Sequence, residues 1–241
     1  GVPGVQSELL KLIASTGKPV AVVLLNGRPL VLEEENRDAD AILEAWYPGT
    51  MGAEAVADII FGQYNPSGKL TMTFPRNVGQ IPIFYYEKNT GRPIYLPSDK
   101  YKSKYLDSPN DPLYPFGYGL SYTEYEYSDL TLASQEMAAD GSLKVSVKVT
   151  NKGDMAGDEI VQLYLRDKYS QVTRPVKELK DFARISLQPG ESKVVEFTIT
   201  PDKLMYLDRK MNPIVEAGEF IVMVGPSSDD KDLMSASFWV K

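Results

Sequence analysis

Residues 113–123 read LYPFGYGLSYT, and the pattern of the chain changes across this stretch. Before it, segments with helical apolar spacing alternate with short apolar runs, whereas after it apolar and polar residues alternate as in β-strands. Aromatic side chains bury a large area, while Gly117 and Gly119 allow turns or close approaches where a Cβ would clash. We therefore predict a rigid, well-packed joint between two domains. An ordinary aromatic-rich strand entry is the alternative.

The part before the joint is predicted to be an α/β domain. Apolar residues at positions 5, 9, 12 and 13 have helical spacing. The apolar runs at 20–25 and 41–46 are typical of strands buried in a parallel sheet, and residues 70–74 are expected to form a third strand. Thr50 is expected to cap a second helix. The buried stripe of that helix is predicted to consist of Ala53, Val56, Ala57 and Ile60. Since no strand precedes the first helix, we expect the first half of this domain to be absent.

The part after the joint is predicted to be a β-sandwich. Strict alternation, as at Leu143, Val145, Val147 and Val149, places one face of each strand in a core. Seven strands are expected, near residues 125–132, 143–150, 161–165, 177–187, 195–199, 220–224 and 233–240, with a helical turn at 201–204. Seven short strands fit an immunoglobulin-like sandwich, and the absence of cysteine favours the fibronectin type III variant.

Composition excludes several kinds of function. The 241 residues carry 33 acidic and 26 basic side chains, a net charge of −7 that argues against nucleic acid or an anionic membrane as partner. No apolar run reaches the roughly 20 residues of a membrane span, and no signal peptide opens the chain. The absence of histidine removes the commonest general base and most zinc sites. No calcium or phosphate loop is evident, so we expect no metal or cofactor, and any catalysis would use carboxylates.

Several segments resemble family 3 glycoside hydrolases, the β-glucosidase and β-xylosidase family. They include TGKPV at 16–20, AILEAWYPG at 41–49, NPSGKLT at 65–71, PFGYGLSYT at 115–123 and RPVKELK at 174–180. Their order and spacing are compatible over essentially the whole chain. The resemblance implies the C-terminal part of such an enzyme, with the second half of its α/β sandwich domain at 1–121 and a fibronectin type III-like domain at 122–241.

The same resemblance places the chemistry elsewhere. A retaining β-glycosidase needs two carboxyl groups roughly 5 Å apart. In the family, the nucleophilic aspartate lies in an N-terminal barrel, and the acid/base glutamate lies in a loop upstream of the segment that opens this chain. No catalytic residue is therefore assigned here. The acidic run Glu33–Glu35 with Asp38 and Asp40 is expected to be a solvated face, and Asp158-Glu159 and Asp229-Asp230 are expected to serve solubility and turns.

Residues 84–112 are predicted to form a loop, because Pro97, Pro109 and Pro112 interrupt any regular element. In the family, the loop around the K-x-T-G-R-P segment lies towards the barrel and the sugar-binding mouth. The resemblance therefore implies that Lys88, Asn89 and Arg92 contact substrate. Relatives often have Asn-His where this chain has Tyr86-Glu87, so those two positions are not assigned. A loop that packs against the missing domain is the alternative.

Two functions from different classes remain. The resemblance implies part of a retaining, exo-acting, periplasmic or secreted β-glucosidase-like hydrolase that acts on a β-glucoside or oligosaccharide, inactive without its barrel domain. The alternative is a non-catalytic polysaccharide- or protein-binding module, with exposed tyrosines such as Tyr164 and Tyr169 stacking on sugar rings. An independent carboxylate hydrolase would need two converging acids, which no spacing demands. An incomplete first domain should expose an apolar edge, which predicts either self-association, for example as a homo-oligomer, or modest solubility.

Overall fold

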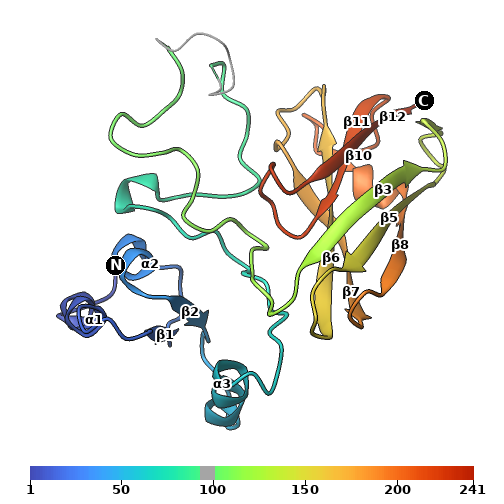
Figure 1. The fold of residues 1–241 in the computed structure, drawn as a ribbon. Helices are drawn as coiled ribbons and strands as arrows, with labels where there is room; N and C mark the ends of the chain where they lie inside the picture. The colour runs from blue at the N-terminus through green and yellow to red at the C-terminus, as the bar shows by residue number, and fades with distance from the viewer. Residues whose placement is uncertain (93–100) are drawn as a thin grey trace. The chain divides into compact units, whose positions relative to one another are not determined.

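The computed structural model describes residues 1–92 and 101–241 (Figure 1). Contacts divide the chain into two compact units. Unit 1 comprises Gly1–Tyr64, Thr71–Phe84 and Lys104–Pro115, and unit 2 comprises Asn65–Leu70, Tyr85–Ser103 and Phe116–Lys241. The predicted domain boundary divides the chain once, at residue 121, whereas each of these units contains several separate segments. The boundary therefore stays a prediction. Part of the predicted loop, including Pro93 and Pro97, lies outside the described residues.

Unit 1 contains short helices around one pair of strands (Figure 1). Its elements are α1 (Gln6–Ala14), β1 (Ala21–Leu24), α2 (Glu33–Asp38), β2 (Ala41–Glu44), α3 (Gly52–Ile60) and the 3-10 helix η1 (Val78–Gln80). Strands β1 and β2 pair in parallel, from Ala21 opposite Ala41 to Leu24 opposite Glu44. The two predicted helices and the parallel strand pair are therefore confirmed.

Three local predictions in unit 1 are wrong. The segment 70–74 makes only an isolated antiparallel bridge, Phe74 to Tyr114, because too few successive residues pair to form a strand. Thr50 does not cap α3, whose N-cap residue is Met51 without a side-chain hydrogen bond. The acidic run is not wholly a solvated face, because Glu35 of the helix α2 is buried and accepts from the Ser7 hydroxyl at 2.6 Å.

Most apolar side chains of helices α1 and α3 are exposed. In α1 only Leu10 is buried, and in α3 the predicted buried stripe is wrong, because Ala53, Ala57 and Ile60 are exposed and Val56 is half-buried. The small sheet offers these helices little surface. The larger exposed apolar residues in 1–64 are Val5, Leu9, Leu12, Ile13, Val23, Leu25, Tyr47, Met51, Ile60, Phe61 and Tyr64. The expectation of an exposed apolar surface in this unit is therefore met.

Unit 2 is built on a β-sandwich that contains all seven predicted strands. They are β3 (Tyr125–Leu132), β5 (Leu143–Asn151), β6 (Gly157–Asp167), β7 (Glu178–Leu187), β8 (Ser192–Ile199), β11 (Gly218–Gly225) and β12 (Met234–Val240). Short elements complete the unit: β4 (Glu136–Met137), α4 (Pro201–Leu204), β9 (Tyr206–Leu207) and β10 (Pro213–Ile214). The predicted helical turn at 201–204 is thus confirmed.

The sandwich has one sheet of five strands, in the order β4-β12-β11-β6-β7, and one of three, in the order β3-β5-β8. Val145, Val147 and Val149 of β5 are completely buried in one core with Val161 and Leu163 of β6. This follows from the period-two pattern of both strands. The fold class, an α/β part followed by an immunoglobulin-like sandwich, is confirmed.

The two glycines of the predicted joint meet close neighbours within unit 2. Gly117 has a φ of +79°, and a Cβ there would lie 2.1 Å from Gln162 Oε1. A Cβ on Gly119 would lie 2.3 Å from the carbonyl oxygen of Gly68. Both positions therefore require glycine, as the sequence indicated.

No helix of the described residues combines the length and apolar character that a membrane crossing requires.

Candidate functional site

The predicted substrate loop is attached to the sandwich near the start of β7. Lys88 forms an antiparallel bridge with Pro175, and the Val176 N–H donates to the Glu87 carbonyl at 2.8 Å. The Leu179 N–H donates to the Tyr85 hydroxyl at 3.3 Å. Backbone pairing on this scale fixes the position of residues 85–88 in unit 2.

The three predicted sugar contacts lie in different surroundings. Lys88 takes part in the bridge, and Asn89 lines a pocket in unit 2. The Arg92 guanidinium carbon lies 5.2 Å from the centroid of the Tyr101 ring, and the Arg92 carbonyl accepts from the Ser103 N–H at 2.8 Å. Lys88 and Arg92 do not line the pocket that Asn89 reaches, so the structure does not gather the three residues around it.

The pocket that includes Asn89 has a volume of about 260 Å³. It lies where β6 ends and the chain returns towards β7. The other lining residues are Arg166, Asp167, Lys168, Tyr169, Ser170, Thr173, Arg174 and Pro175. Among them, only Tyr169 was predicted from the sequence to contact a sugar, although Arg174 and Pro175 belong to the segment RPVKELK. A signal was present, because the run Arg-Asp-Lys-Tyr-Ser directly after a predicted strand concentrates polar groups at one strand end.

Arg174 of this pocket contacts a carboxylate and an aromatic ring. Its Nη2 lies 2.5 Å from Glu178 Oε2, and its guanidinium carbon lies 4.9 Å from the centroid of the Tyr206 ring. Its Nε is buried without a hydrogen-bond partner. A guanidinium fixed at one end by a carboxylate and along its plane by an aromatic ring presents its remaining donor in a set direction.

Asp167 supplies the carboxyl group of the pocket, and its Oδ2 is also buried without a hydrogen-bond partner. Burial, followed by the nearby charge of Glu216, raises the pKa of Asp167 to about 6, against weaker opposing effects of the Tyr169 N–H, Arg174 and Ser170. A single carboxyl group does not make the pair that retaining hydrolysis needs. The pocket therefore does not supply the two carboxyl groups that glycoside cleavage of this kind needs.

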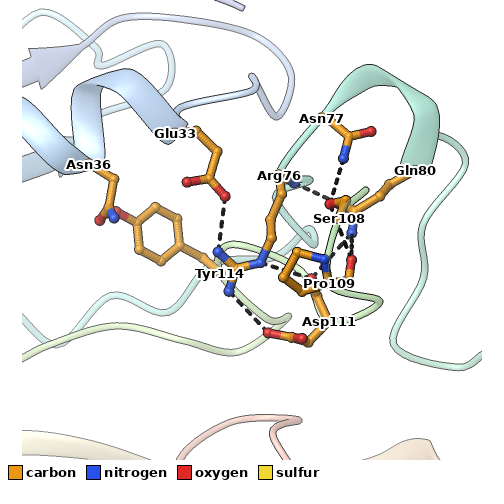
Figure 2. Close-up of polar contacts among 9 residues, drawn as sticks. All are labelled: Glu33, Asn36, Arg76, Asn77, Gln80, Ser108, Pro109, Asp111 and Tyr114. Carbon is orange, nitrogen blue, oxygen red and sulfur yellow. Dashed lines mark hydrogen bonds and ion pairs between the residues drawn. The ribbon is translucent and has the colours of Figure 1, made fainter. Parts of the chain in front are cut away.

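A second polar cluster lies in unit 1 and is centred on Arg76 (Figure 2). Arg76 Nη1 lies 2.9 Å from Glu33 Oε1, and Nη2 lies 3.0 Å from Asp111 Oδ2. The backbone N–H of Arg76 donates to Gln80 Oε1 at 2.6 Å, and Gln80 Nε2 donates to the Pro109 carbonyl at 2.9 Å. Because one arginine joins Glu33 of α2 to Asp111, this cluster stabilises the loops of unit 1.

Outside these two clusters, the burial of one acidic residue differs from what the sequence predicted. Glu159 does not serve solubility, because it is buried on β6, where it accepts from the Tyr127 hydroxyl at 2.8 Å and lies 3.2 Å from Lys69 Nζ. Burial raises the pKa of Glu159, and the Lys69 ammonium offsets only part of that effect. Asp158 is half-buried, and its Oδ2 accepts from Arg184 Nε at 2.9 Å.

The two tyrosines proposed for sugar stacking differ sharply. Tyr164 is completely buried, because it points into unit 2, where its ring meets Tyr85 edge-on at 5.8 Å, so its proposed role is wrong. Tyr169 is 71% exposed at the pocket. The alternating sequence pattern of β6 could not reveal that Tyr164 is buried, because β6 is buried on both faces around this residue.

Within residues 1–92 and 101–241, no group of three or more acidic side chains is arranged to hold a metal ion.

Comparison with known proteins covers both parts of the chain. The model of the glycosyl hydrolase family 3 C-terminal domain matches residues 1–122, and the model of the fibronectin type III-like domain matches residues 159–228. A periplasmic beta-glucosidase of Salmonella typhimurium is 50% identical over 94% of this chain and 30% of its own length. A beta-xylosidase of Formosa agariphila is 48% identical over 99% of this chain and 32% of its own length.

Solved structures give the same result. The crystal structure of a beta-glucosidase from Listeria innocua in complex with glucose has a TM-score of 0.92 and 43% identity, over 99% of this chain and 33% of that one. The chain thus spans about a third of the length of these relatives.

Proposed function

Because the chain belongs to glycosyl hydrolase family 3, we propose that it is the C-terminal portion of a retaining, exo-acting β-glucosidase-like enzyme that hydrolyses O-glycosyl bonds. One observation carries this proposal. Relatives that match almost the whole chain at 50% and 48% identity are a β-glucosidase and a β-xylosidase, and the chain spans only about a third of each.

The catalytic carboxylates are proposed to lie in a barrel domain outside this chain. Arg76 holds Glu33 and Asp111, and Glu159 is paired with Lys69, so none of these acids is available for the chemistry. The exposed apolar side chains of α1 and α3 support completion of unit 1 by a further segment. The chain alone should therefore be inactive, and the same apolar surface should promote its self-association into a homo-oligomer.

The substrate is proposed to be a neutral carbohydrate, a β-glucoside or oligosaccharide, and the place of action the periplasm or the exterior. The name of the Salmonella relative supports the compartment, and the glucose complex of the Listeria relative supports the sugar. Lys88, Asn89 and Arg92 are proposed to donate hydrogen bonds to sugar hydroxyls. The backbone pairing of residues 85–88 to the sandwich would hold this loop in place.

A chimera tests the proposal. The matching C-terminal third of the Salmonella periplasmic β-glucosidase is replaced by this chain, and hydrolysis of an aryl β-glucoside is measured for the chimera and for the isolated chain. We expect turnover by the chimera and none above background by the isolated chain. Turnover by the isolated chain would contradict the proposal, as would a folded chimera without activity.

The loop is tested in the same chimera. Asn89→Ala should raise KM about tenfold, because a lost hydrogen bond to a sugar hydroxyl costs about 1 kcal/mol or more. Lys104→Ala, at an exposed position with no proposed role, is the matched control. Equal KM values for both variants and the unchanged chimera would remove Asn89 from the substrate contacts.

A further inference from the structure

Asn26 and Gly27 form the only asparagine–glycine pair of the chain, in the turn that follows β1. An asparagine followed by glycine can lose its side-chain amide without an enzyme. The backbone nitrogen of the next residue attacks the asparagine Cγ, and ammonia leaves as a cyclic succinimide closes. Glycine favours this attack because no Cβ crowds the attacking nitrogen.

The other asparagines of the chain have less favourable neighbours. Asn65 and Asn212 precede proline, whose nitrogen carries no hydrogen and cannot attack. Asn77 and Asn89 precede β-branched residues, whose side chains crowd the attacking nitrogen. The rest are each followed by a charged side chain: Asn36, Asn110 and Asn151. The sequence therefore favours reaction at Asn26.

The structure leaves the Gly27 nitrogen open to react. Gly27 is exposed and lies outside the helices and strands, and no group in the described part of the chain accepts a hydrogen bond from its N–H. Asp140 and Gly141, a pair that can close the same ring, differ in this respect. The Gly141 N–H donates to the Ala138 carbonyl at 2.9 Å, so that nitrogen is held in a turn.

The Asn26 side chain extends towards Gly27. Its Nδ2 donates at 2.7 Å to the carbonyl of Arg28, two residues on, so the amide reaches across the intervening Gly27 peptide. Its Oδ1 has no hydrogen-bond partner, so turning Cγ towards the Gly27 nitrogen breaks no bond at that oxygen. The burial of Oδ1 is no obstacle, because both reacting atoms of the first step belong to the chain itself.

We propose that Asn26 is a site of spontaneous deamidation in the folded chain. The Gly27 nitrogen loses its proton to solvent and bonds to Cγ of Asn26, while the bond from Cγ to Nδ2 breaks and Nδ2 leaves as ammonia with a proton from solvent. Water then opens the succinimide at either carbonyl, which gives aspartate or isoaspartate at position 26. The proposal is independent of the proposed glycoside hydrolysis.

The product carries a new carboxylate at the end of the small sheet of unit 1. Burial raises the pKa of Glu44 on β2, and the Trp46 N–H and the Asn26 side chain lower it. A carboxylate at position 26 would repel an ionised Glu44 instead, and isoaspartate adds a carbon to the backbone after β1. Deamidation should therefore loosen the parallel pairing of β1 with β2.

The experiment follows the 241-residue chain during incubation in a mildly alkaline buffer, with peptide mapping by mass spectrometry. We expect Asn26 to deamidate about tenfold or more faster than the exposed Asn89, because Thr90 crowds the nitrogen that would attack Asn89. The product should contain both aspartate and isoaspartate, which electron-transfer fragmentation distinguishes. Asp140 should form little isoaspartate over the same time.

A second incubation in urea separates the effect of the fold from that of the sequence. Because the Gly27 nitrogen is already open in the folded chain, unfolding should accelerate the reaction at Asn26 only severalfold. Asp140, whose neighbouring N–H is hydrogen-bonded in the folded chain, should gain much more.

The effect on the sheet is measured by hydrogen exchange. Exchange of the β1 and β2 amides should become faster as deamidation proceeds, and Asn26→Asp should show this faster exchange from the start. Asn26→Gln, whose longer side chain does not form the succinimide, is the matched control and should keep its exchange rates throughout the incubation.

Three outcomes would overturn the proposal. Deamidation of Asn26 no faster than that of Asn89 would mean that the pair is not reactive. A reaction far slower in the folded chain than in urea would mean that the fold protects Asn26. Unchanged exchange of β1 and β2 in the deamidated chain and in Asn26→Asp would contradict the effect on the sheet.

Discussion

Helix α1 in unit 1 and strand β5 in unit 2 have equally regular apolar patterns but opposite surroundings. Leu9 and Leu12 of α1 are 55% and 68% exposed, whereas Val145 and Val147 of β5 are completely buried. In unit 2 a facing sheet covers the apolar side of β5, while in unit 1 a two-stranded sheet covers little of α1. Periodicity thus identifies the apolar face of an element, but not whether this chain contains the surface that covers it.

The largest expected effect comes from emptying the sandwich core. Phe238 is completely buried and stacks on Phe220 with ring centroids 5.6 Å apart. Phe238→Ala should lower the free energy of unfolding of unit 2 by about 3–5 kcal/mol, because it removes apolar contacts and leaves a cavity. Urea unfolding followed by far-UV circular dichroism measures this.

Phe61→Ala is the matched change in unit 1, where the ring is 77% exposed. It should change the free energy of unfolding of the isolated chain by less than about 0.5 kcal/mol. Comparable losses for the two variants would contradict the contrast between the units.

The next effect concerns the buried ion pair of unit 2. Lys69→Met keeps the aliphatic stem but leaves Glu159 buried without its cation, which should cost about 3 kcal/mol at pH 7. Since burial already raises the pKa of Glu159, the protonated carboxyl is tolerated in the folded state. The cost should therefore shrink in acid and grow as the pH rises through that raised pKa.

Lys144→Met is the control for this pair. Lys144 Nζ lies 3.9 Å from Glu196 Oε2, and the two side chains are 70% and 65% exposed. Its removal should cost less than about 0.5 kcal/mol at any pH, measured by the same urea titrations. A pH-independent loss in Lys69→Met would mean that packing, and not charge, explains its effect.

Comparing two glycines distinguishes the free-energy cost of a steric clash from the cost of a positive φ. Gly117→Ala should destabilise unit 2 by about 2–3 kcal/mol, because it combines a positive φ with a contact at Gln162. Gly190 has a φ of +74°, but no atom lies within 4 Å of the position that an added methyl group would take, so Gly190→Ala should cost only about 1 kcal/mol. Thermal melts of both variants measure the difference, and equal losses would show that Gln162 moves aside freely.

The smallest effect is expected at Asp167. Its pKa is raised to about 6 in the folded chain, above the ordinary aspartate value of 3.8, so the folded state loses stability as the pH rises from about 4 to about 6. Asp167→Asn should remove that loss and stabilise unit 2 by about 1 kcal/mol at pH 8, since solvent screens part of the effect. At pH 3.5 the two proteins should differ little. Destabilisation by the variant at pH 8 would contradict the assigned pKa direction.

The sequence predicted unit 2 more completely than unit 1. The strands of the sandwich alternate strictly, and the side chains that cover them, such as Val161 and Leu163, belong to the same chain. In α3 the stripe of Ala53, Val56, Ala57 and Ile60 was regular too, but the described part of the chain supplies nothing to bury it. The short α2 was missed because its charged residues show no apolar period.

The candidate pocket was only partly predictable. Asn89 came from a resemblance between segments, and Tyr169 from its aromatic character. The roles of Asp167 and Arg174 depend on partners that lie apart in the sequence, Glu216 for the first and Tyr206 for the second. Local patterns carry no information on such pairings, which form because residues 206 and 216 fold back beside the segment between β6 and β7.

Native-state hydrogen exchange tests the contrast between the units most directly. Exchange is measured on the isolated chain and on its chimera with the Salmonella β-glucosidase, comparing the amides of α1 and α3 with those of β5 and β6. We predict slow exchange of β5 and β6 in both proteins, and fast exchange of α1 and α3 that becomes slow only in the chimera. Equally slow exchange of α1, α3 and β5 in the isolated chain would contradict the claim that unit 1 is completed by a segment outside this chain.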